Sequence, residues 1–182
     1  NEDVDAVNVS TPDHWHAVMA IYCAKRKKHV YGQKPLAVTI AEGRAMAKAV
    51  AKNKVTWQTG SQQRSESQFR EAVEFVRNGR IGNLKKISIK IPGGHSNWNQ
   101  MGDRLEPEPI PDGLNYDLWQ GPAAYREYRP ALLPLNWRHN YDYSGGMITD
   151  WGAHHVDIAQ WAMDMGNTIR YSEVLSRAQS EL

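Results

Sequence analysis

The sequence predicts an α/β fold, in which a parallel sheet over residues 1–82 precedes an α+β region over residues 83–182. Three observations predict it. Short apolar strands alternate with helices through residue 78, as parallel strands joined by helical crossovers do. Residues 84–91 then alternate like a strand with one solvated face. Residues 92–143 hold seven of the nine prolines, lack clear periodicity, and lead into a last helix.

The first three elements form a strand–helix–strand unit. Residues 4–9 run apolar like a buried parallel strand, and Asp13 is the expected N-cap of a helix through about residue 28. A brief second strand is expected at residues 29–31.

The next three elements repeat this order. Thr39 and Glu42 fit a capping box, which predicts a helix from there to about residue 53. A third strand follows at residues 55–59, and another helix is expected over residues 67–78.

Composition narrows the class of protein. Apolar residues form 41% of the chain, enough for a core, and the net charge of +2 is nearly balanced. The densest basic run, at residues 25–28, closes a predicted helix, so nucleic acid is not an expected partner. Cys23 is the single cysteine and cannot form an internal disulfide. No apolar run approaches the roughly 18 residues of a membrane span.

The chain starts without Met, and its first residues already lead into a strand. We therefore expect a fragment whose true N-terminus lies upstream. The compartment stays unassigned, with the cytoplasm favoured over export.

Three consecutive strands are followed by polar or reactive residues. In parallel sheets ligands bind outside the carboxyl ends of the strands, so these residues predict a ligand groove. Lys34 stands out there because Pro35 keeps its backbone out of a helix, and a partly desolvated lysine can exchange a proton with a hydroxyl or carbonyl. A surface lysine is the alternative. The residues of the groove are Ser10, Thr11 and Pro12, then Gln33, Lys34 and Pro35, then Gly60, Ser61, Gln62 and Gln63.

The last helix carries a second candidate site. Asp150 and His154 are four residues apart, so they share one helical face, where a carboxylate can orient an imidazole for proton transfer. An ordinary intrahelical pair is the alternative. The preceding Gly145-Gly146 allows a ligand close to the backbone. Trp151, Ile158 and Ala162 lie on another face and are expected in the core.

Aromatic and planar polar side chains alternate in the proline-rich segment. Flat rings beside hydrogen-bonding groups suit a sugar or cyclitol, although the rings could simply pin an irregular segment. The expected pocket wall includes Trp98, Trp119, Trp137, Arg138 and Tyr143.

A metal site is the rival interpretation of the histidines. Asp13, His14 and His16, or Asp150 with His154 and His155, could supply ligands. Adjacent residues on a helix point about 100° apart, and no HExxH-like pattern occurs, so we expect no metal.

Together these residues resemble the Gfo/Idh/MocA oxidoreductases over roughly residues 3–166. Residues 9–16 (VSTPDHWH) are similar to the family's strand end with its downstream histidine, residues 32–35 (GQKP) to its Glu-Lys-Pro motif, and residues 145–154 to its glycine-rich D-x-x-x-H signature. The resemblance implies the later half of a Rossmann-type sheet, followed by an incomplete α+β substrate domain.

The resemblance also implies site residues and a cofactor. Lys34, Asp150 and His154 would be catalytic and would also contact the substrate, with Lys34 or His154 taking the proton as hydride passes to NAD or NADP. The residues expected to line the cofactor are Ser10, Thr11, Pro12, His16, Gln33, Lys34, Pro35 and Gln62. The implied full-length protein oxidises or reduces a secondary hydroxyl or keto group of a sugar or cyclitol and forms a homo-oligomer.

Two of the chain's departures from the family pattern concern the cofactor. It contains no G-x-G-x-x-G loop for the pyrophosphate, and Gln33 stands where the family has glutamate. We therefore expect this chain alone to be inactive. Two alternatives remain: a glycosidase that retains NAD and works by transient oxidation and elimination, or a non-catalytic sugar-binding fragment.

Overall fold

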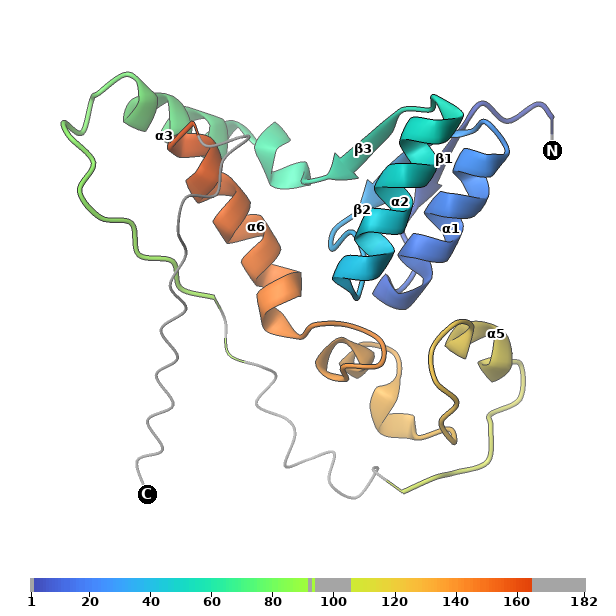
Figure 1. Ribbon diagram of the computed structural model, residues 1–182. Coiled ribbons are helices and arrows are strands. Elements are labelled where there is room, and N and C mark those ends of the chain that lie inside the picture. The colour runs from blue at the N-terminus through green and yellow to red at the C-terminus, as the bar shows by residue number, and fades with distance from the viewer. Residues whose placement is uncertain (1, 92, 94–105, 165–182) are drawn as a thin grey trace, which may run out of the picture.

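The computed structural model describes residues 2–91, 93 and 106–164. Figure 1 shows a sheet of three strands with helices α1 and α2 lying side by side over one face, and helices α3 and α6 paired beyond the end of β3. The strands are β1 (Ala6–Val9), β2 (His29–Gln33) and β3 (Trp57–Gly60), and the two covering helices are α1 (Asp13–Lys25) and α2 (Ile40–Asn53).

The strands run parallel in the order β1-β2-β3. Val9 lies opposite Gly32, and Gln33 lies opposite Gly60, so all three strands finish at the same edge of the sheet. This confirms the predicted parallel α/β unit and the gathering of the three polar strand ends. The second strand is two residues longer than expected, and the third begins at Trp57 rather than at residue 55.

Trp57 fills the space between the sheet and its helices. It packs against both buried clusters, one of Val9, Cys23 and Val30 and the other of Ala17, Ala20 and Met46. Its ring covers Gly32 so closely that a Cβ there would lie 2.1 Å from ring atom Cη2. Glycine at this position of β2 is therefore required by packing.

The helix ends agree only in part with expectation. The capping box of α2 is confirmed, because the Glu42 amide donates to Thr39 Oγ1 and the Thr39 amide donates to the Glu42 carboxylate. The N-cap of α1 was wrongly predicted: Pro12 holds that position, and Asp13 is the first helical residue. The α1 helix also stops at Lys25, before Lys27 turns to a positive φ of 60°.

The rest of the described chain contains short helices around the long α6. Helices α3 and α6 confirm the two predicted in this region. No helix of the described chain has the length and apolar character needed to cross a membrane. The elements are η1 (Gln62–Ser65), α3 (Ser67–Arg77), α5 (Tyr116–Gln120), η3 (Pro130–Leu132), η4 (Asn136–His139) and α6 (Met147–Ala162).

The strand expected at residues 84–91 does not form. Among the described residues no other strand pairs with this segment, and backbone groups in an extended chain need such a partner. Its apolar residues Leu84, Ile87 and Ile89 instead line a cavity of about 420 Å³ against α3 and α6.

Trp151 was expected in the core, and this was wrong. Its side chain is 42% exposed, whereas Ile158 and Ala162 line the apolar cavity. About two turns of helix separate Trp151 from Ile158. Trp151 lies at the polar cavity described below.

Candidate active site

Two adjoining cavities lie between the sheet edge and α6. The first, of about 370 Å³, includes the ends of β1 and β2, and the second, of about 350 Å³, lies between η1 and α6. They share Leu135, Arg138 and Asp150, so they form one continuous polar region. The first is lined by Ser10, Thr11, Pro12, Asp13, Gln33, Lys34, Pro134, Leu135, Trp137, Arg138 and Asp150. The second is lined by Gln62, Gln63, Leu135, Arg138, Asp150, Trp151 and His154.

An ion pair joins the two sites that the sequence singled out. The Lys34 ammonium contacts carboxylate oxygen Oδ1 of Asp150 and donates a hydrogen bond of 3.1 Å to the Asp150 carbonyl oxygen. The side chains are only 16% and 22% exposed, respectively. Residues 116 positions apart therefore share one partly desolvated site at the mouth of the sheet.

Arg138 is the second cation at Asp150. Its Nε lies 3.7 Å from Asp150 Oδ2, and its guanidinium lies over the ring of Trp137 at 4.4 Å from the ring centroid. Since Lys34 contacts Oδ1, each oxygen of the Asp150 carboxylate has a cationic neighbour. Asp150 therefore positions two cationic side chains at the junction of the two cavities.

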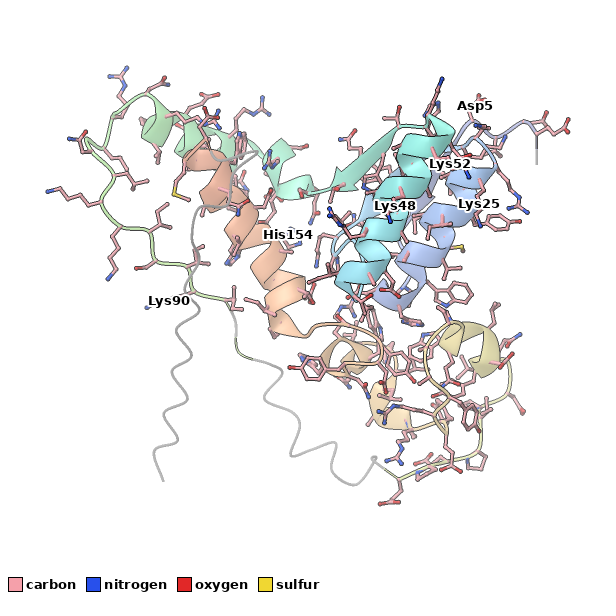
Figure 2. The ribbon with its side chains drawn as sticks, in the orientation of Figure 1. Asp5, Lys25, Lys48, Lys52, Lys90 and His154 are labelled. Atoms are coloured by element: carbon pink, nitrogen blue, oxygen red, sulfur yellow. The ribbon has the colours of Figure 1, made fainter. Side chains whose placement is uncertain are left out.

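This arrangement differs from the expected Asp150–His154 pair. Within the described part of the chain no hydrogen bond joins these side chains, and buried His154 Nδ1 has no hydrogen-bond partner. Figure 2 shows His154 on the side of α6 that faces the sheet. Burial, reinforced by the Lys34 charge, lowers the pKa of His154 against the opposing effect of Asp150. A neutral imidazole, able to accept a proton, is therefore favoured at neutral pH.

Other polar atoms along the cavities also lack protein partners. Thr11 Oγ1 and Gln63 Oε1 are buried without a hydrogen bond in the described structure. Buried polar groups of this kind normally have partners. Together with His154 Nδ1, they are polar groups beside the two cavities whose hydrogen-bonding capacity the described residues leave unused.

These residues fit one end of a dinucleotide. Four predicted cofactor-lining side chains, those of Ser10, Thr11, Gln33 and Lys34, together with Pro12, reach the first cavity from adjacent strand ends. Gln62 reaches the second. The sequence has no glycine-rich loop for a pyrophosphate, so the fit concerns the part of a cofactor that lies at this sheet edge.

His16 contacts the backbone next to the site. The side chain is 1% exposed and lines neither cavity, while its ring nitrogens lie 2.6 Å from the Pro35 carbonyl oxygen and 2.8 Å from the Thr11 carbonyl oxygen. His16 thus holds the chain after β1 and the chain after β2 together. Pro35 likewise stays outside the cavity lining.

The aromatic segment divides into two groups. Trp137 and Arg138 line the first cavity, as expected of a pocket wall. Tyr143 is completely buried and packs with Trp119 against His14, whose pKa is lowered by burial. Those rings therefore hold the segment to the start of α1. Trp98 lies outside the described residues.

Sequence reasoning missed the site role of Asp13. It was predicted as a helix cap and weighed as a metal ligand, yet it lines the first cavity and accepts a 2.5 Å hydrogen bond from the Ser144 hydroxyl. Its position directly after a strand end was the available signal. No spacing rule reveals a partner 131 residues away.

The candidate metal ligands do not converge. In the portion of the chain with defined positions, no three histidine, cysteine or acidic side chains are grouped as a metal would require. His16 binds backbone carbonyls, and His155 Nδ1 lies 3.0 Å from the Lys90 carbonyl oxygen.

The fold and site define an α/β protein with a ligand groove at the carboxyl edge of a parallel sheet, and comparison with known proteins identifies its family. Residues 1–61 match the family model "Oxidoreductase family, NAD-binding Rossmann fold", and residues 65–180 match "Oxidoreductase family, C-terminal alpha/beta domain". The chain belongs to the Gfo/Idh/MocA oxidoreductase family, in agreement with the resemblance of its motifs. The predicted division at residue 82 stays a prediction.

Individual relatives include two sugar or cyclitol dehydrogenases. The chain is 39% identical to myo-inositol 2-dehydrogenase of Thermotoga maritima over 87 residues, which are 48% of this chain and 26% of that protein. It is 33% identical to levoglucosan dehydrogenase of Pseudarthrobacter phenanthrenivorans over 160 residues, which are 87% of this chain and 33% of that protein.

A solved structure extends the likeness to the fold. The crystal structure of an oxidoreductase domain protein from Kribbella flavida is 29% identical, with a TM-score of 0.62, covering 90% of this chain and 36% of that one. The chain therefore spans about a quarter to a third of the length of the curated relatives that it matches.

Proposed function

We propose that the full-length protein is an NAD(P)-dependent oxidoreductase that oxidises or reduces a secondary hydroxyl or keto group of a sugar or cyclitol. The observation that carries this proposal is the Lys34–Asp150 ion pair at the junction of two polar cavities. The substrate class is supported by the relatives named above, a myo-inositol dehydrogenase and a levoglucosan dehydrogenase.

Lys34 is the proposed hydrogen-bond donor to the reacting oxygen of the substrate. Its ammonium, which contacts the Asp150 carboxylate, can donate a hydrogen bond to the substrate oxygen that develops negative charge as its proton leaves. Asp150 keeps the ammonium directed into the cavity through its carboxylate and its carbonyl oxygen.

His154 is the proposed proton acceptor in the oxidising direction. Its lowered pKa favours the neutral ring, and its Nδ1 has no hydrogen-bond partner within the described structure. A general base must be deprotonated at the working pH and lie within reach of the proton that it takes. In the reducing direction the same ring returns the proton.

The cofactor supplies hydride chemistry when it is bound. Ser10, Thr11, Pro12 and Gln33 would line its reactive end, with Lys34 beside it. Trp137 and Arg138 would then face the substrate from the opposite wall. Self-association of the full-length protein stays a prediction.

The test is a turnover assay on the full-length protein with NAD⁺ or NADP⁺ and a panel of sugars and cyclitols. We expect Lys34→Ala and His154→Ala each to lower turnover by at least about 10²-fold, the usual contribution of a hydrogen-bond donor to developing charge or of a positioned proton-transfer group. The matched controls are Lys48→Ala, an exposed lysine on α2, and His155→Ala, the neighbouring ring outside both polar cavities.

The outcomes separate the alternatives. Near-normal rates in both Lys34→Ala and His154→Ala would contradict the catalytic assignment. Sugar cleavage without release of reduced cofactor would favour the NAD-retaining glycosidase. Sugar binding without turnover of any kind would favour a binding protein.

A further inference from the structure

We infer that Ser144 and Asp13 are positioning residues of this active site, and that the hydrogen bond between them sets Asp150 against Lys34. The inference rests on the proposed function, since it concerns the geometry of that site. Neither residue is assigned a direct part in proton or hydride transfer.

The hydrogen bond is buried and spans the two parts of the site. The Ser144 hydroxyl donates to Asp13 Oδ2 at 2.5 Å, and the residues are 1% and 7% exposed, respectively. Asp13 begins α1, which covers the sheet, whereas Ser144 belongs to the segment that leads into α6. Burial raises the pKa of Asp13, against the opposing effects of this hydrogen bond and of the nearby Lys34 and Arg138 charges.

Ser144 is separated from the first residue of α6 by only two residues. Two glycines follow it, and Gly146 occupies the N-cap position of α6 with a φ of 70°. Asp150 is in the first turn of that helix, and its amide donates to the Gly146 carbonyl oxygen at 3.0 Å. We therefore expect the Ser144–Asp13 hydrogen bond to hold the start of α6, and loss of that bond to displace the first turn that carries Asp150.

A second contact holds α6 farther along the helix, at Asp157. Arg64 on η1 makes a two-point contact with Asp157, at 2.6 and 2.7 Å. Asp157 lies about two turns beyond Asp150, so that contact fixes the middle of α6. The Ser144–Asp13 contact fixes the start of α6 against the start of α1. Helix α1 begins just after β1, at the same edge of the sheet where Lys34 follows β2.

The first experiment reports on geometry without using catalysis. Amine labelling of the folded full-length protein is followed by peptide mass spectrometry, with exposed Lys48 as the internal reference. In the wild type, we expect contact with Asp150 and low exposure to slow the labelling of Lys34. We expect Ser144→Ala to label Lys34 several-fold faster relative to Lys48, and Ser67→Ala, which removes an exposed hydroxyl, to leave the ratio unchanged.

The second experiment is a double-mutant cycle on turnover. Ser144→Ala and Asp13→Ala each remove one partner of the hydrogen bond, and misplacement of a catalytic group by about 1 Å can cost up to about 10²-fold. We expect each to lower kcat by about 10-fold or more, and the double variant to lose no more than the worse single variant, because both break the same contact. If Asp13→Ala does not fold, Asp13→Asn replaces it, and a smaller loss in the same direction is expected.

Two results would overturn the inference. One is a Lys34 labelling ratio unchanged by Ser144→Ala in a protein with a normal circular-dichroism spectrum. The other is a double variant whose loss equals the product of the two single losses. A wild-type protein without oxidoreductase activity would refute the proposed function instead, and the labelling ratio would still decide the positioning role.

Discussion

Removal of the Asp150 carboxylate should cost more stability than removal of the Lys34 ammonium. In Asp150→Asn, Lys34 and Arg138 remain in one cavity without the anion between them. In Lys34→Met, the carboxylate still has Arg138, whose Nε lies 3.7 Å away. The two residues of this ion pair should therefore contribute unequally to the free energy of unfolding.

The magnitude follows from burial. Unit charges about 4 Å apart attract by about 4 kcal/mol at an effective dielectric constant of about 20. Desolvation and side-chain ordering offset most of this, and fully exposed pairs contribute under about 1 kcal/mol. Because these side chains are 16% and 22% exposed, we expect a coupling free energy of about 1–2 kcal/mol. Asp150→Asn should cost about 3 kcal/mol, and Lys34→Met about 1–2 kcal/mol.

The assay is urea denaturation of the full-length protein without cofactor, at neutral pH. Tryptophan fluorescence and circular dichroism should give coincident transitions, which permits a two-state free energy. The double variant Lys34→Met/Asp150→Asn completes the cycle. Strict additivity of the two single effects, or a greater cost for Lys34→Met, would refute the reasoning.

Three further variants test packing, capping and titration. Gly32→Ala places a Cβ 2.1 Å from the Trp57 ring and should lower the free energy of unfolding by about 1–3 kcal/mol, measured in urea. Thr39→Ala removes the hydroxyl that caps α2 and should cost about 1 kcal/mol in the same assay. Because the pKa of His154 is lowered in the folded state, the unfolded chain binds a proton at this ring more readily than the folded chain does. The free energy of unfolding should therefore fall as the pH falls from about 6.5 through the folded-state pKa. His154→Gln should flatten the stability curve below about pH 6.5, and an unchanged slope there would contradict this.

The fold of the first half of the chain could be predicted because the sequence patterns that indicate it are local. The order of strands and helices, the Thr39–Glu42 capping box and the three polar strand ends each depend on residues within one turn or one strand. Parallel strands must all finish at the same edge, so topology alone brought Thr11, Gln33 and Gln62 toward one groove.

The segment at residues 84–91 shows where local signals fail. Its alternation correctly indicates one apolar face, since Leu84, Ile87 and Ile89 line a common cavity. Alternation does not supply a hydrogen-bonding partner, and within the described residues none is present, so no strand forms.

The candidate site residues were predicted from the sequence, but the contacts that they make were decided by the tertiary structure. Spacing placed Asp150 and His154 on one helical face and suggested that they pair. Once α6 lies against the sheet, Asp150 meets the cations Lys34 and Arg138, which attract a carboxylate more strongly than a neutral imidazole does.

The sequence by itself therefore determined the parallel α/β unit, the groove at its edge and most of the residues that line it. Periodicity, capping and strand ends are properties of neighbouring residues, so they can be read along the chain. Only the tertiary structure decided that Asp150 holds Lys34, that Ser144 binds Asp13 and that His154 keeps a free ring nitrogen in the described site. Those contacts join residues more than 100 positions apart or depend on burial, and no local pattern encodes either.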